Sequence, residues 1–282
     1  MPFSRVYLEI TNCCNLACSF CPGTTRRAAF LTVAQFTHLA GTLRGQTRFL
    51  YFHVMGEPLL HPDLPELLDI AGRMGFRVVL TTNGTLLPKR QRELLAAQAL
   101  HKVSVSLHSF EANSGVDMAA YLTGCTDFGL AASEAGILID YRLWNLDGAE
   151  TRGRNEQNDA ILNHLHAAYP GNWTQNTWGW RLCDRTFIHY GEKFDWPSPD
   201  APDHGEAGTC RALRDQLAVL CDGTVVPCCL DGEGRIPLGN LLAQPLDEIL
   251  AAEPARSIAA GFALQKRLHP LCRRCGYAQR FR

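Results

Sequence analysis

Two groups of cysteines stand out in the sequence, because thiolates at their spacing can bind iron or zinc. The first group is Cys14, Cys18 and Cys21, a C-x3-C-x2-C pattern that follows a strand-like run. Three thiolates this close can bind three corners of a [4Fe–4S] cluster, which leaves the fourth iron open to a substrate or a cofactor. A three-cysteine zinc site and unconnected buried thiols are the alternatives that the spacing leaves open.

The second group lies near the C-terminus and consists of Cys210, Cys228, Cys272 and Cys275. Cys228 ends a hairpin that the dipeptide Asp222-Gly223 predicts. The last two cysteines form a C-x2-C pair, and the whole set suits zinc and iron equally well. Cys229 adjoins Cys228 and is the alternative ligand at that corner of the site.

The elements that position the first group alternate between strands and helices over residues 1–190. Runs rich in β-branched and aromatic residues predict strands at Val6–Thr11, Arg48–Val54, Phe76–Thr82, Lys102–Leu107, Ile137–Trp144 and Thr177–Tyr190. Apolar residues at helical spacing predict helices at Thr32–Leu43, Asp63–Met74, Pro88–Ala99 and Asn155–Ala168. This alternation predicts an α/β fold, a partial (β/α)6 barrel whose ligands bind at the carboxyl ends of its parallel strands.

The pattern changes after the barrel. Residues 191–208 are rich in Pro, Gly and Asp and predict a linker. Residues 209–282 predict a small domain with the hairpin and with short helices at Pro245–Ala252 and Pro254–Phe262. Because the core of such a domain is thin, a bound metal or cluster would help to keep it folded.

The composition is that of an ordinary water-soluble protein. The chain has 282 residues, 46% hydrophobic and 20% charged, with a net charge of −1 and a mean hydropathy of −0.10. This balance provides no general electrostatic footprint for duplex nucleic acid or an anionic membrane, and no apolar run is long enough to span a bilayer. The N-terminus has no signal-peptide pattern, so we expect a cytoplasmic protein with reduced cysteines.

Several motifs resemble those of the radical S-adenosylmethionine (SAM) superfamily. The segment Ile10–Leu16 with its following cysteines is similar to the family's cluster loop. Met55-Gly56-Glu57-Pro58, after the second predicted strand, resembles the family's G-G-E-P turn, with Met55 in place of the first glycine. Thr81–Gly84 and Ser104–His108 are similar to the ends of the family's third and fourth strands.

The resemblance implies a cofactor site. SAM would chelate the open iron, and its reductive cleavage would give a 5′-deoxyadenosyl radical that abstracts a hydrogen atom from substrate. Phe20 would pack beside the adenine, and the Gly56–Glu57 backbone would receive the methionine ammonium. Asn83 and Ser106 would complete the cofactor set. Arg142 would pair with the SAM carboxylate, and a surface ion pair is the alternative for this residue.

The C-terminal segment resembles the shortened SPASM, or twitch, domain of radical SAM enzymes. In that domain four cysteines fully bind one auxiliary [4Fe–4S] cluster, so the resemblance implies two clusters in this chain. It also implies an electron donor such as flavodoxin or ferredoxin. Basic residues in the C-terminal tail offer a docking patch for an acidic donor, or a solvated surface.

Polar residues on or just beyond the predicted strands are the candidates for substrate contact and catalysis: Glu9, His53, His108, Trp144 and Asn145. They lie on the side where parallel-sheet enzymes bind ligands. Without a ligand, buried polar side chains there would lack evident partners, and a structural hydrogen bond within the protein is the alternative for Glu9 and His53.

These inferences predict a radical SAM lyase or oxidoreductase (dehydrogenase) acting on a small polar metabolite. A nucleoside, a modified nucleobase such as that of queuine salvage, or an aminocyclitol fits the expectation. Few residues precede the first predicted strand, so we expect no fused leader-peptide domain. A ribosomal-peptide maturase and a non-catalytic zinc-binding interaction protein are the alternatives.

Overall fold

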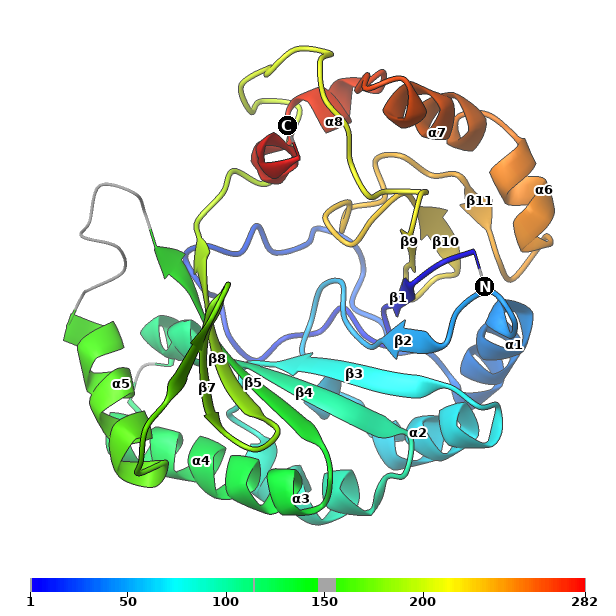
Figure 1. The fold of residues 1–282 in the computed structure, drawn as a ribbon. Helices are drawn as coiled ribbons and strands as arrows, with labels where there is room; N and C mark the ends of the chain where they lie inside the picture. The colour runs from blue at the N-terminus through cyan, green and yellow to red at the C-terminus, as the bar shows by residue number, and fades with distance from the viewer. Residues whose placement is uncertain (1, 114, 147–155, 282) are drawn as a thin grey trace.

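The computed structural model describes residues 2–113, 115–146 and 156–281, and its central element is a sheet of eleven strands (Figure 1). Six neighbouring strands run parallel: β1 (Arg5–Leu8), β2 (Phe49–Tyr51), β3 (Arg77–Thr82), β4 (Leu100–Ser106), β5 (Leu138–Leu146) and β8 (Thr186–Glu192). They form a curved arc with helices on its outer face (Figure 1). The α/β fold and the partial barrel are therefore confirmed.

The helices that connect these strands are α1 (Val33–Leu43), α2 (Leu64–Arg73), α3 (Leu87–Ala96), α4 (Met118–Glu134) and α5 (Glu156–Ala168). Thr32 caps α1 by a reciprocal pair of hydrogen bonds with Gln35, as its sequence position suggests. The predicted helix start at Asn155 lies outside the described residues. Sequence reasoning missed α4, because its glycines favour a helix only weakly. Gly129 serves packing instead, since a Cβ there would collide with the Tyr141 hydroxyl.

The two faces of the sheet differ in chemistry. Along β4, Val103 and Val105 are fully buried toward the helices, whereas Lys102 and Ser104 alternate with them on the inner face. The outer face therefore supplies the hydrophobic core, and the inner face is left for polar side chains.

The C-terminal hairpin extends the same sheet. Strands β9 (Gln216–Val219) and β10 (Thr224–Val226) pair antiparallel across the predicted turn, and β11 (Gly239–Asn240) follows at the edge. β9 also pairs parallel with β1, so the hairpin is continuous with the barrel.

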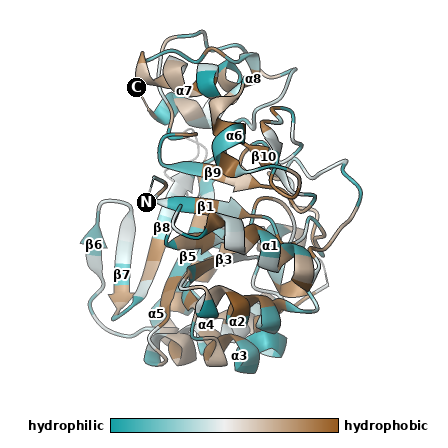
Figure 2. Cartoon of the chain, turned by 90° about the vertical axis from the view of Figure 1, so that its right-hand side faces the viewer, coloured by the Kyte–Doolittle hydropathy of each residue, from teal (hydrophilic) through white to brown (hydrophobic). Residues whose placement is uncertain are grey.

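The remaining elements flank this sheet. At the other edge lie β6 (Thr174–Asn176) and β7 (Gly179–Cys183). Helices α6 (Leu246–Ala251), α7 (Ala255–Ala263) and α8 (Pro270–Arg273) lie beside the open part of the arc, above the barrel in Figure 2. Of the helices in the described ranges, none has the length and apolarity that a membrane crossing requires.

Candidate active site

The loop that follows β1 presents the three N-terminal cysteines together. Cys14 and Cys21 are exposed and Cys18 is partly exposed, and none of them forms a disulfide. Burial, with the neighbouring thiols of Cys21 and Cys14, raises the pKa of Cys18 to about 12. The three thiols are thus close enough to interact and remain accessible, which fits the corners of one cluster.

The turn at Gly56–Glu57 packs directly under this loop. The Glu57 backbone N–H donates to the Cys13 carbonyl at 2.7 Å. Gly56 has φ +78°, and a Cβ there would lie only 2.5 Å from the Thr11 carbonyl oxygen. Only glycine allows this close approach. The Met55 side chain packs against Gly232, so the residue that departs from the family pattern contacts the C-terminal domain.

The Glu57 side chain connects the turn to the end of β3. Its carboxylate accepts the backbone N–H groups of Leu59 at 3.0 Å and Asn83 at 2.7 Å. Burial raises the pKa of Glu57 to about 7. The Asn83 amide in turn donates to Asn15 Oδ1 at 2.9 Å, so the predicted cofactor residues Gly56, Glu57 and Asn83 surround the cluster loop.

Phe20 and His108 lie together on the other side of the cluster loop. Their ring centroids are 4.7 Å apart, and His108 Nδ1 lies 3.0 Å from the Arg142 carbonyl oxygen. Burial lowers the pKa of His108 to about 4, so the imidazole is neutral near pH 7. Ser106 pairs in register with Arg142, which places both predicted cofactor residues beside this histidine.

A charged network covers the inner face of β4, β5 and β8, with Asp140 at its centre. Its carboxylate contacts Lys102 at 2.8 Å, His189 at 2.6 Å and Arg142 at 3.5 Å, and it accepts a hydrogen bond from Ser104. Burial opposes ionisation, but the hydrogen bond from His189 and the nearby cations hold the pKa of Asp140 well below its usual range. Sequence reasoning missed Lys102, Ser104, Asp140 and His189. The alternation that selected Arg142 could have found Asp140, two residues earlier on the same face.

Two predicted substrate residues carry buried polar atoms without a partner among the described residues, namely His53 Nδ1 and Trp144 Nε1. His53 Nε2 lies 3.4 Å from Thr81 Oγ1, and burial together with the charge of Arg142 lowers the pKa of His53 to about 3. The Trp144 ring packs under the Arg142 guanidinium at 4.7 Å. Both side chains therefore have hydrogen-bonding capacity to offer a ligand.

Glu9 and Asn145 have protein partners instead. The fully buried Glu9 carboxylate forms a two-pronged ion pair with Arg26 at 2.6 and 2.9 Å. It also accepts the backbone N–H groups of Met55 and Cys221. Asn145 exchanges two amide hydrogen bonds with Asn158 of α5, on the outer side of the sheet. These contacts account for both residues without a substrate.

The four C-terminal cysteines predicted as ligands, Cys210, Cys228, Cys272 and Cys275, interact with one another. Burial raises the pKa of Cys228 well above its ordinary value, with smaller contributions from Cys229, Cys210, Cys272 and Cys275. The Cys229 thiol interacts with the Tyr7 hydroxyl and packs with Ala218 and Val226. The Cys228 thiol therefore interacts with all three of the other predicted ligands.

Neither cysteine group has the geometry of a single-ion site. Among the described residues, no three His, Cys, Asp or Glu side chains converge as ligands of one metal ion. Structural zinc needs four such ligands around one point, whereas a [4Fe–4S] cluster takes one thiolate at each of its separate irons.

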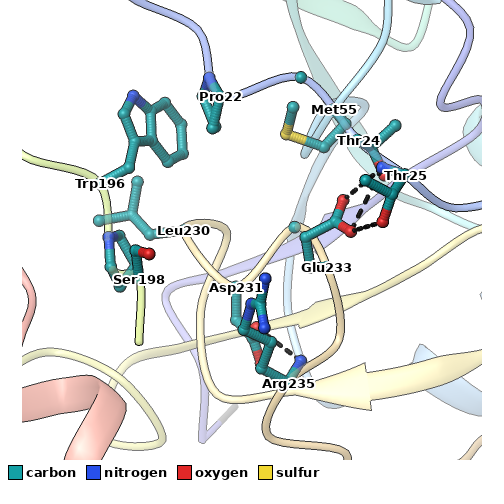
Figure 3. A pocket seen from close by; sticks show the side chains of 13 residues that line it. Pro22, Thr24, Thr25, Met55, Trp196, Ser198, Leu230, Asp231, Glu233 and Arg235 are labelled. Carbon is teal, nitrogen blue, oxygen red and sulfur yellow. Dashed lines mark hydrogen bonds between the residues drawn. The ribbon is translucent and has the colours of Figure 1, made fainter. Parts of the chain in front are cut away.

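A cavity of about 240 Å³ lies between the cluster loop and the C-terminal domain (Figure 3). Thr25 and Met55 line it from the barrel side, and Trp196, Leu230 and Glu233 line it from the later part of the chain. Glu233 accepts hydrogen bonds from the Thr25 N–H and hydroxyl, and Trp196 donates to the Phe20 carbonyl at 2.9 Å. The predicted linker thus forms one wall of the cavity.

Comparisons with known proteins agree with this site. The model of the radical SAM superfamily matches residues 8–121, and that of the SPASM iron–sulfur cluster-binding domain matches residues 210–276. The chain is 36% identical over 113 residues to GTP 3′,8-cyclase of Chlorobaculum tepidum, covering 38% of this chain and 33% of that protein. It is 34% identical over 112 residues to PqqA peptide cyclase of Streptomyces rochei, covering 38% and 30%. The matched segments span about a third of these relatives' length.

A solved structure extends the likeness to the whole fold. The chain superimposes on BtrN in complex with AdoMet and 2-DOIA with a TM-score of 0.62 and 18% identity, covering 97% of this chain and 92% of that one. Fold, cysteine geometry and both family matches agree. Residues 8–121 belong to the radical SAM superfamily and residues 210–276 to the SPASM iron–sulfur cluster-binding domain, and these two matches imply SAM and two [4Fe–4S] clusters as the cofactors.

Proposed function

We propose that this protein abstracts a hydrogen atom from a small polar metabolite bound on the inner face of the barrel. The observation that supports this most directly is the pair of unpartnered buried atoms, His53 Nδ1 and Trp144 Nε1, beside the charged network of Asp140. A site with such groups favours hydroxylated or amide-bearing substrates, because an apolar ligand would leave them unsatisfied.

The bound cofactors would supply the radical, and the chain would supply position and a controlled environment. Cys14, Cys18 and Cys21 would hold the first cluster, and the Gly56–Glu57 turn, Asn83, Phe20, Ser106 and Arg142 would receive SAM. The neutral imidazole of His108 would support Phe20 without adding charge. Trp144 would donate its indole N–H to the substrate.

The substrate classes we favour are a nucleoside, a modified nucleobase such as that of queuine salvage, or an aminocyclitol, with lyase or dehydrogenase outcome. The likeness to GTP 3′,8-cyclase and to BtrN with bound 2-DOIA supports small polar substrates.

A peptide substrate is the second candidate, supported by the likeness to PqqA peptide cyclase. We also propose a cytoplasmic reductant such as flavodoxin or ferredoxin. Within the basic residues of the C-terminal tail, Arg273 pairs with Asp203 at 2.9 Å, whereas Arg280 donates to the Glu192 carbonyl and stacks on Tyr277, contacts that do not neutralise its charge.

The test is release of 5′-deoxyadenosine by the anaerobically reconstituted enzyme with dithionite and SAM, in the presence of nucleosides, aminocyclitols or peptides. We expect one of the two small-molecule classes to stimulate release. In the Trp144→Phe variant, the stimulation of 5′-deoxyadenosine release by substrate should fall at least tenfold, while the slow substrate-independent cleavage of SAM remains. The control is Trp178→Phe, whose side chain is 72% exposed and which should behave as the parent. Stimulation by peptides alone would overturn the small-metabolite proposal.

A further inference from the structure

Arg267 is a buried cation without an acidic partner in the part of the chain that the structure describes. It is 2% exposed, and its Nε and Nη1 groups are buried with no hydrogen-bond acceptor. Its third nitrogen, Nη2, donates to the Ala207 carbonyl at 2.6 Å. Arginine is almost never fully buried unless it is paired. Buried N–H donors normally have a hydrogen-bond acceptor, so we expect a further group to accept from Nε and Nη1.

The position of Arg267 connects it to the auxiliary cysteines. The side chain bonds to Ala207, three residues before Cys210, and its own backbone N–H donates to the Glu206 carbonyl at 2.6 Å. The guanidinium charge acts on the thiols of Cys210, Cys272 and Cys275, although burial remains the largest influence on each. The guanidinium therefore lies against the segment that leads to Cys210, and its charge acts on three of the four predicted cluster ligands.

The neighbouring backbone is shaped to admit this side chain. Gly208 has φ +132°, and a Cβ there would run into the guanidinium group. Glycine at this position removes both the backbone strain and the collision. The segment that leads to Cys210 is thus fitted around Arg267.

We propose that Arg267 is the tuning residue of the auxiliary cluster: its free N–H groups face the cluster and its charge raises the cluster's reduction potential. A four-thiolate cluster is anionic and gains one further negative charge when it accepts an electron. A buried cation with hydrogen bonds to the cluster sulfur atoms favours the reduced form. The inference rests on the cluster itself and holds whichever substrate the enzyme uses.

The experiment is an anaerobic redox titration of the reconstituted full-length protein, followed by EPR spectroscopy. In Arg267→Gln the ratio of reduced to oxidised auxiliary cluster at a fixed potential should fall at least tenfold, about 59 mV for one electron. The N-terminal cluster in the same sample is the internal reference and should not shift. Arg256→Gln, at an exposed side chain of the same domain, should behave as the parent.

A matched glycine pair tests the same cation without removing it. Gly208→Ala should displace the guanidinium and lower the potential, whereas Gly205→Ala, with φ +81° and no atom near its Cβ, should leave it unchanged. An unchanged potential in Arg267→Gln with full iron content would overturn the proposal. If Arg267→Gln loses the auxiliary iron, the Arg267→Lys variant distinguishes the two roles of this residue. Retention of the cluster in Arg267→Lys would support the role of the charge. Equal loss of iron in both variants would show that Arg267 only anchors Ala207, and would overturn the proposal.

Discussion

His108 shows how one buried side chain can couple stability to pH. It is 5% exposed, packs on Phe20, and contacts the Arg142 carbonyl. Burial lowers its pKa to about 4, against an ordinary value near 6.5. The unfolded chain therefore binds a proton at this histidine between these two values while the folded protein does not.

The stabilising effect of a neutral His108 is present above pH 6.5 and is lost as the pH falls toward 4. Between pH 6.5 and pH 4, we expect His108 to lower the free energy of unfolding by about 1.4 kcal/mol for each unit by which the pH falls. His108→Asn keeps a polar group near the Nδ1 position but cannot titrate, so it should flatten this part of the profile. Urea denaturation from pH 8 to pH 5 measures the effect. The exposed His38→Asn variant is the control, and equal slopes in both variants would contradict the prediction.

At the scale of elements, the Gly56–Glu57 turn determines how closely β2 approaches the cluster loop. We expect Gly56→Ala to weaken SAM binding at least tenfold, because its Cβ would push the Thr11 carbonyl away from the turn. Gly75→Ala is the matched control, with φ +85° but open space around its Cβ. Anaerobic equilibrium dialysis with labelled SAM measures the binding. A similar loss in both variants would attribute the effect to backbone strain alone.

The order of the elements could be predicted from the sequence because local patterns encode it. The cysteine spacing, the capping residue Thr32 and the Asp222-Gly223 turn each act within a few residues. The contacts of Glu9 could not be predicted in this way. Its partners Arg26, Met55 and Cys221 come from three later segments, and only the fold brings them to one carboxylate.

On the inner face of the sheet, the sequence likewise predicts only part of the contacts. Alternation along β5 indicates which residues share a face, and it correctly groups Trp144 with Arg142. It does not indicate that Asn145, one residue further, meets Asn158 of α5. Nor does it reveal that Lys102, Asp140 and His189 form one network, because that depends on the register between three strands.

For the molecule as a whole, the auxiliary domain should depend on its cluster. Cys228→Ala should reduce iron from about eight to about four per chain and destabilise the C-terminal segment, because cluster binding contributes directly to folding. Cys229→Ala should keep all the iron, since its thiol contacts Tyr7. Iron analysis and limited proteolysis measure the two effects. Iron loss in the Cys229 variant instead would exchange the roles of the two cysteines.

The parallel pairing of β1 with β9 has a consequence for how the protein is made. Arg5 pairs with Gln216, so β1 receives its second neighbour only after all the strands and helices of the barrel between them have been synthesised. Contacts this distant in sequence slow folding and leave strand edges exposed in the meantime. The cluster loop follows β1 directly, so its thiols are available long before their surroundings are complete. We therefore expect iron and sulfide to reach Cys14, Cys18 and Cys21 most safely after β9 has been synthesised and has paired with β1.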